Sequence, residues 1–325
     1  MRRDPRRLVL AAGLLVLAPM CAEYVTGYDD STGDPLALAA NLLIFGPLYG
    51  APALLIRETA RRLGMSWPGI LALAAAFGVL QAGVVDQSMF SEGYRDSPYW
   101  EEMTGPTYVA PLGLAAFTAL SFVAGHAIWS FAVPIALTEA LSPRLSRTPW
   151  LRTPGLVTAA VLYLAAAALV LREHLRTEDD HATAAQIAGA LAAVALLVLF
   201  ALSRRSCDRA VREGAAPRPI VVAAGGLVAG LVFDFLPSTW AGVAAGLAVI
   251  ALCGTIAVRL ARSPRWTIRH SAALAAGALT ARAAVGFFAV PLGEVAPVAK
   301  YAHNVAFLAG AVLLGVLAAR RRGAA

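Results

Sequence analysis

Residues 183–203 read TAAQIAGALAAVALLVLFALS, a run of 21 residues without a single charged side chain. The hydrocarbon core of a bilayer is about 30 Å thick, so a helix needs about 20 apolar residues to cross it. Backbone N–H and C=O groups find no water there and must bond one another, which a helix allows within one segment. This stretch therefore predicts a transmembrane helix.

Nine other runs of similar length and polarity predict an all-α, polytopic transmembrane helix bundle. The 325 residues are 59% hydrophobic and only 14% charged, whereas a soluble domain carries about 25% charged residues. No connection between the runs is long enough for a soluble domain, so we expect a single integral membrane domain over residues 1–325. The ten predicted spans cover approximately residues 8–26, 35–56, 67–90, 109–138, 154–172, 183–203, 219–236, 239–260, 271–291 and 302–319.

The basic residues predict the orientation of the chain. Arginines cluster in alternate connections, for example at Arg57, Arg144 and Arg204, whereas the other connections carry acids such as Glu92 and Asp180. Because cytoplasmic loops are rich in Lys and Arg, both termini are predicted to be cytoplasmic. A composition rich in Ala and Arg is typical of GC-rich bacterial genomes, so we expect a bacterial cytoplasmic membrane. The basic start also resembles a secretory signal, but Ala18–Ala22 is a poor cleavage site and favours an uncleaved span.

Several functional classes are disfavoured by the sequence. The net charge of +7 comes from short basic clusters between apolar runs, so it does not predict a nucleic-acid-binding face. Cys21, Cys207 and Cys253 form neither a disulfide framework nor a metal-ligand spacing. Nucleotide-binding, zinc-hydrolase and nucleophile-elbow motifs are missing. We therefore expect no cofactor and no metal, favour a non-enzymatic role, and expect the lipid bilayer as a partner.

Two local patterns each have two interpretations. The loop at about residues 91–108 holds four aromatic residues, which form either a recognition lid or an interfacial aromatic belt. Glycines four residues apart, at Gly46/Gly50, Gly226/Gly230 and Gly242/Gly246, let helix backbones approach closely. We favour packing within the bundle over dimerisation for these glycines.

Polar residues inside the predicted spans are the candidate functional residues, since ionisable groups in lipid are costly and usually face a bundle interior. Most fall in the outer half of the membrane, and His126 and Arg282 are expected near mid-depth. If they converge, they form a polar pocket open to the outside. The predicted substrate-binding residues are Glu23, Asp86, Gln87, His126, Asp234, Arg282, His303 and Asn304, with Asn41 and Gln81 as further intramembrane polar residues.

Arg282 is the most informative of these residues, because a buried guanidinium needs an acidic or carbonyl partner. Glu23, Asp86 and Asp234 are the acids available, and the pair is either structural or part of a solute or proton site. His126 is either a hydrogen-bonded core residue or a weak catalytic candidate. Arg57 is interpreted as a snorkelling side chain at the membrane interface.

Two resemblances are carried by short motifs. Phe122–His126 matches the FxxxH pattern of the CAAX-prenyl-protease and bacteriocin-processing (CPBP) membrane family. The window Gln81–Asp86 stands where that family has EExxxR but lacks its glutamates and arginine, and His303 lacks the family's HxxxN spacing. The resemblance therefore implies a degenerate, non-proteolytic member. Leu54–Glu58 is similar to uncharacterised bacterial multi-pass membrane proteins, which implies no mechanism.

Three functions stay open from the sequence. The favoured hypothesis is binding or transport of a small polar or anionic solute through the outward polar pocket. The second is a non-catalytic scaffold or regulator of a protein partner that the sequence does not identify. The third is a CPBP-like intramembrane hydrolase using His126 and His303, which the missing glutamates disfavour.

Overall fold

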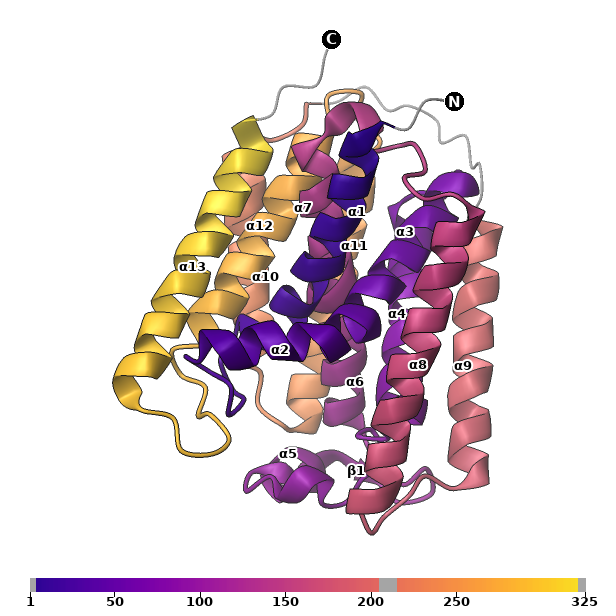
Figure 1. Cartoon of the computed structure of the whole chain (residues 1–325), viewed down its shortest axis with the longest axis vertical. Helices are drawn as coiled ribbons and strands as arrows, with labels where there is room; N and C mark the ends of the chain where they lie inside the picture. Colours follow the sequence, from indigo (N-terminus) through magenta and orange to yellow (C-terminus); the bar gives the residue numbers. More distant parts are fainter. Residues whose placement is uncertain (1–3, 205–214, 321–325) are drawn as a thin grey trace.

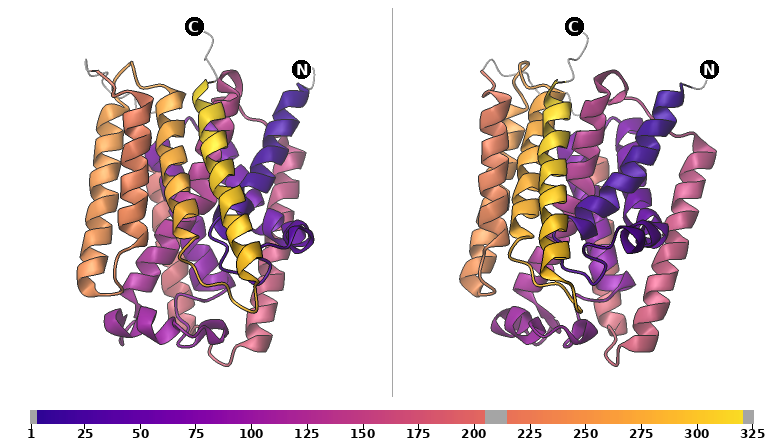
Figure 2. Two further views of the ribbon diagram at one scale, coloured as in Figure 1. Left: turned by 90° about the vertical axis from the view of Figure 1, so that its left-hand side faces the viewer. Right: turned by 60° about the vertical axis from the view of Figure 1, so that its left-hand side comes forward.

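The computed structural model describes residues 4–204 and 215–320, and these form an all-helical bundle (Figure 1). Most of the long helices run along one common axis, as the two further views in Figure 2 also show. This agrees with the predicted fold class. The elements of the described residues are, in chain order, α1 Pro5–Pro19, η1 Met20–Tyr24, α2 Pro35–Phe45, η2 Gly46–Gly50, α3 Ala51–Arg62, α4 Trp67–Leu80, η3 Gln81–Val85, η4 Tyr94–Asp96, α5 Trp100–Thr104, η5 Gly105–Thr107, β1 Tyr108–Val109, β2 Leu114–Ala115, α6 Ala116–Gly125, η6 His126–Ala132, α7 Val133–Leu141, η7 Pro143–Leu145, α8 Thr153–Thr177, α9 Ala184–Ser203, α10 Pro219–Asp234, α11 Trp240–Leu260, α12 Ile268–Val285 and α13 Pro297–Arg320.

Eight helical segments of the described residues are long and apolar enough to cross a membrane. Helices α10 and α12 lie where two further spans are predicted, but α10 has only 16 residues and α12 carries Arg269, His270 and Arg282. The span count of ten therefore stays a prediction. The eight segments are Pro5–Tyr24, Pro35–Arg62, Trp67–Val85, Ala116–Leu141, Thr153–Thr177, Ala184–Ser203, Trp240–Leu260 and Pro297–Arg320.

The bundle has two chemically different ends. The start of α1 and the end of α13 lie at the same end (Figure 1), which we call the arginine-rich end because the α3 terminus with Arg61 and Arg62 is also there. The opposite end carries the loops at residues 25–34, 86–115, 178–183 and 286–296, and we call it the acidic end. In the orientation predicted from the arginines, the acidic end faces outside.

The predicted second span is kinked at its centre. The π-helical turn η2 joins α2 to α3, and α2 lies obliquely across the bundle whereas α3 follows the common axis (Figure 1). Pro47 lacks the backbone N–H that a regular helix needs. At Gly50 a Cβ atom would lie only 2.2 Å from the carbonyl oxygen of Leu15, so α1 can cross here only against a glycine. The kink therefore follows from sequence and packing together.

The C-terminal part of the bundle is held together by small residues. A Cβ atom on Gly226 would lie 2.4 Å from the Leu274 carbonyl oxygen, and one on Gly277 would lie 2.0 Å from that of Ala223. Helices α10 and α12 thus touch backbone to backbone. The interpretation that the Gly226/Gly230 pair serves packing within the bundle is confirmed by these contacts.

We expect Gly277→Ala to lower the thermal midpoint of the detergent-purified protein, because the added methyl group meets backbone that cannot move aside. Overpacking of this kind costs about 1–3 kcal/mol. Gly310→Ala in α13 is the matched control, since nothing lies within 4 Å of its Cβ position. Equal midpoints for both variants would contradict the close contact of α10 and α12.

Candidate functional site

The candidate site is built around four π-helical turns. They are η1, η2, η3 and η6, one in each of the first four predicted spans: η2 and η6 interrupt a helix that continues, whereas η1 and η3 end theirs. In a π turn the backbone bonds reach five residues instead of four, as from the Asp86 N–H to the Gln81 carbonyl oxygen at 3.0 Å. Such turns are rare and are frequent at functional sites. The turns η1 and η6 contact each other, and α1 contacts both η2 and η6.

Each of these turns brings a polar side chain toward the same region. Glu23 lies in η1, Tyr49 in η2 and His126 in η6, and Asp86 directly follows η3. The ring of Tyr49 stacks on the imidazole of His126 with centroids 5.9 Å apart. The Glu23 carboxylate accepts a hydrogen bond from the Tyr28 hydroxyl and lies near the hydroxyl of Tyr49. We call Glu23, Tyr28, Tyr49, Asp86 and His126 the π-turn cluster.

The acids of the π-turn cluster are held by neutral donors. Asp86 accepts from the Ser88 backbone N–H at 3.0 Å and from the Gln81 side-chain amide at 3.3 Å. Neither Glu23 nor Asp86 forms an ion pair with a described residue within 4.0 Å. Both carboxylates lie close enough to act electrostatically on His126 and Tyr49. The cluster is therefore negatively charged when both acids are ionised.

The loops at the acidic end come close to this cluster. Burial and the charge of Glu23 raise the pKa of Tyr28 well above its ordinary value, so its hydroxyl stays protonated and donates to Glu23. Burial also raises the pKa of Tyr94, and the charge of Asp86 raises it further. Burial alone would lower the pKa of Arg95, but the neighbouring phenols and acids outweigh it and raise that pKa. Tyr94 and Arg95 thus lie close to the acids.

Arg282 forms an ion pair away from the π-turn cluster. Its Nη1 lies 2.7 Å from Oδ1 of Asp234, and its guanidinium lies over the Trp129 ring at 4.9 Å. Of the three acids that the sequence offers as partners, Asp234 is the one that pairs. Helix α12 ends at Val285 instead of reaching 291, so Arg282 lies in its last turn, and its depth in the membrane stays a prediction. A cation at a helix C-terminus is favourable.

Three other predicted site residues fix loops to helices. His303 pairs through Nε2 with the Tyr24 carbonyl oxygen at 2.7 Å, and its Nδ1 accepts from the Gly33 N–H at 3.3 Å. Asn304 donates to the Gly286 carbonyl oxygen at 2.9 Å. The side-chain oxygen of Gln87 accepts from the Ala182 N–H at 2.7 Å. Both ring nitrogens of His303 are thus engaged, which leaves no lone pair for the catalytic role that the CPBP resemblance implies.

The predicted residues therefore divide into three groups. Glu23, Asp86 and His126 come together in the π-turn cluster. Arg282 and Asp234 form a separate ion pair, and the remaining residues fix loops. The sequence did not single out Tyr28, because a tyrosine near a span end is ordinary at a membrane interface, nor Tyr49, because a tyrosine is not an ionisable group at neutral pH and so did not count as a costly residue in the span.

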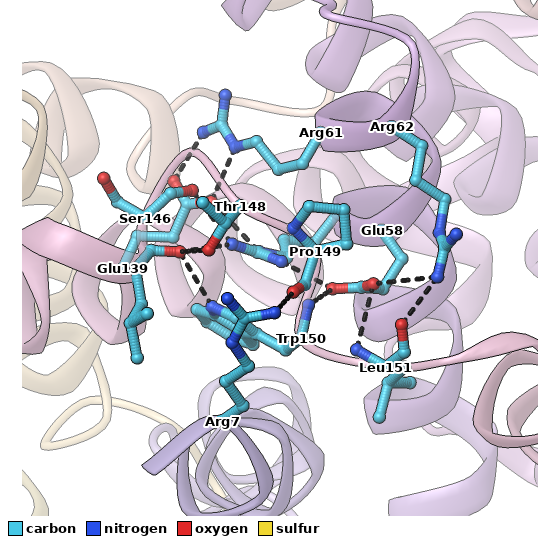
Figure 3. Close-up of polar contacts among 12 residues, drawn as sticks. Arg7, Glu58, Arg61, Arg62, Glu139, Ser146, Thr148, Pro149, Trp150 and Leu151 are labelled. Atoms are coloured by element: carbon cyan, nitrogen blue, oxygen red, sulfur yellow. Dashed lines mark hydrogen bonds and ion pairs between the residues drawn. The ribbon is translucent and has the colours of Figure 1, made fainter. Parts of the chain in front are cut away.

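The arginine-rich end contains a second polar arrangement, the charged network of Arg57, Glu58, Arg61 and Glu139 (Figure 3). Arg57 and Glu58 are 0% exposed and Glu139 is 2% exposed. Nε of Arg57 lies 3.1 Å from Oε1 of Glu139, and Nε of Arg61 donates to the same oxygen at 2.7 Å. The interpretation of Arg57 as a snorkelling side chain is wrong, because Glu139 and Glu58 neutralise it inside the protein.

This network also binds the connection between α7 and α8. Glu58 accepts from the backbone N–H groups of Trp150 and Leu151 at 2.8 and 3.1 Å. Arg7 of α1 donates to the Pro149 carbonyl oxygen at 2.9 Å, as Figure 3 shows. Glu139 is not among the residues predicted from the sequence, although an acid at the arginine-rich end of a span could have indicated a partner for Arg57. The network and its hydrogen bonds connect α1, α3, α7 and the start of α8. We therefore interpret it as a structural clamp, that is, a set of contacts that holds these helices together.

Comparison with known proteins gives one match. The model of an uncharacterized membrane protein family matches residues 13–325. No curated protein and no solved structure matches the chain.

We expect Glu139→Gln to destabilise the protein strongly, because Arg57 then keeps only Glu58 as a buried counter-charge. Breaking a buried ion pair costs about 3–5 kcal/mol. The measurement is the thermal midpoint in detergent, with Glu173→Gln as the control because it makes the same chemical change at an exposed glutamate outside the network. A midpoint for Glu139→Gln as high as that of the control would show that the network is not a clamp.

We expect Arg282→Met to be more destabilising than Asp234→Leu. The first variant leaves an unpaired aspartate whose side chain is 3% exposed, whereas the second leaves an unpaired arginine whose side chain is 30% exposed. The double variant Arg282→Met/Asp234→Leu should recover much of the loss, since no charge is left unpaired. Thermal midpoints of the four proteins form a double-mutant cycle. Strictly additive losses would mean that the two residues are not energetically coupled.

Proposed function

This chain belongs to that uncharacterized membrane protein family, and we propose that it binds a small polar solute at the π-turn cluster as one step of transport. Its apolar helices make it a multi-pass membrane protein in contact with the lipid bilayer. The specific activity is inferred from the chemistry of the cluster.

The observation that carries the proposal is a pair of carboxylates that no cation of the described residues approaches within 4.0 Å, although Arg95 acts on both from farther away. Glu23 and Asp86 come from different spans, and both carboxylates lie close enough to interact electrostatically with His126 and Tyr49. An anion enclosed in a membrane protein is costly unless a cation, a proton or a strong donor offsets it. A solute that brings positive charge or several N–H or O–H donors supplies this compensation.

The charge of the cluster favours a positively charged or zwitterionic solute over a simple anion. Anion binding was expected at Arg282, but the Asp234 carboxylate already lies 2.7 Å from its guanidinium. At the π-turn cluster an anion would meet two carboxylates. The hydroxyls of Tyr28 and Tyr49 and the imidazole of His126 add groups that can orient a polar solute by hydrogen bonding.

The irregular helices support a site that changes shape. A π turn widens the helix and disrupts its regular bonding pattern, so it allows local adjustment. Four such turns surround one polar cluster, while α8 to α13 are continuous helices. In transporters, interrupted helices commonly form the substrate site. If the acidic end faces outside as predicted, the site is loaded from that side.

A thermal-shift screen of the detergent-purified full chain tests the proposal. The probes are inorganic cations, small amines, amino acids and small anions. We expect a positively charged or zwitterionic probe to raise the midpoint, and Glu23→Gln and Asp86→Asn each to weaken its binding by about tenfold or more, the loss of one charged hydrogen bond.

Glu173→Gln is the matched control, because Glu173 is an exposed acid near the acidic end of α8 and lies outside the cluster. It should keep the wild-type response. A response limited to anions, lost in Arg282→Met and kept in Glu23→Gln, would place the site at Arg282 and overturn the proposal. No response to any probe would also reject solute binding.

A further inference from the structure

A folded cap covers part of the acidic end. It comprises residues 88–115, with the short helix α5 and the β1–β2 hairpin, in which Tyr108 pairs with Ala115. Trp100 is buried, stacks on Phe122 of α6, and donates to the Ser91 carbonyl oxygen at 2.9 Å. This loop is therefore an ordered unit, and Trp100 belongs to its core instead of a lipid-facing aromatic belt.

The cap forms one side of a partly open pocket of about 340 Å³, which we call the cap cavity. Known ligand pockets start at about 300 Å³, so the space suits a small molecule. Its lining combines the apolar residues Met89, Leu114 and Ala115 with the polar or charged residues Thr104, Tyr108 and Glu92. Glu92 is the only charged residue in this lining.

The walls of the cavity are fixed by the α8–α9 connection and the start of α9. Asp180 accepts from the Glu92 backbone N–H at 2.6 Å and from the Ser91 hydroxyl at 3.2 Å. The side-chain amide of Gln186 donates to the Leu112 and Gly113 carbonyl oxygens, each at 3.2 Å. Because residues outside the lining already fix the cavity walls, ligand binding should cost little conformational entropy for ordering them.

Glu92 and Tyr108 lie together at this cavity. The Tyr108 hydroxyl is 3.5 Å from Oε1 of Glu92, and 43% of Tyr108 is exposed, so the ring is available to a ligand. A carboxylate beside an accessible aromatic ring is a good binding site for an organic cation, which gains both a charge contact and a cation–π contact. Apolar lining residues complement the methyl or methylene groups of such a molecule.

We propose that the cap cavity binds a small organic ammonium ion, with Glu92 and Tyr108 as its recognition residues. A metal ion fits the lining poorly, since Mg²⁺ and Ca²⁺ require about six oxygen ligands close together and the lining supplies one carboxylate. The surrounding loops strengthen the attraction for a cation, because they carry Glu101, Glu102 and Glu178 against a single arginine, Arg95. This site is separate from the π-turn cluster and does not rest on the function proposed there.

Isothermal titration of the detergent-purified full chain with choline tests this inference. Its neutral isostere, 3,3-dimethylbutan-1-ol, has the same shape without the charge. We expect saturable binding of choline and at least about tenfold weaker binding of the alcohol, as loss of a carboxylate and a cation–π contact implies. Glu92→Gln and Tyr108→Leu should weaken choline binding to a similar degree, and Tyr108→Phe should retain it.

Glu101→Gln removes an acid of the same cap outside the cavity lining and should bind choline like the wild type. Unchanged tryptophan emission in Glu92→Gln would show that the cap around Trp100 is still folded. Equal affinity for choline and the alcohol, wild-type binding by Glu92→Gln, or no saturable binding would each overturn the inference. Glu23→Gln separates the two sites, because it should leave choline binding at the cap unchanged whether or not the π-turn cluster binds a solute.

Discussion

A charge enclosed by a membrane protein must find its compensation within the protein, and this constraint organises the whole chain. At the arginine-rich end, Arg57 is completely buried and is neutralised by Glu58 and by Glu139, which lies 82 residues away in sequence. At the acidic end, Arg282 is neutralised by Asp234. Glu23 and Asp86 have no such cation within ion-pair distance among the described residues, and this exception marks the candidate site.

The first four predicted spans and the C-terminal helices α10 and α12 pack in different ways. The first four predicted spans contain all four π turns of the described residues, and the side chains of Tyr49 and His126, from two of these turns, stack on each other. Helices α10 and α12 are regular and pack so closely that Gly226 and Gly277 touch backbone. Irregular backbone is tolerated in a membrane only where protein surrounds it. Here the π turns contact neighbouring helices, and α12, one of the closely packed helices, contacts η6.

The two proposed sites share an attraction for positive charge but differ in construction. The π-turn cluster is made of side chains from several spans, so its geometry depends on how those helices pack. The cap cavity is made by one loop that Asp180 and Gln186 fix from the next connection. The two sites use different residues, but the cap adjoins both, since its Tyr94 and Arg95 lie close to Glu23 and Asp86.

The sequence by itself determined the class of protein and the approximate course of its helices, because hydropathy adds up along the chain and a run such as residues 183–203 has one stable state in lipid. It also determined that Arg282 needs a partner. Only the tertiary structure decided that this partner is Asp234, that Glu139 meets Arg57, and that His303 binds backbone. These choices depend on how each helix is rotated and kinked, which is set by contacts between segments far apart in the chain and not by local composition.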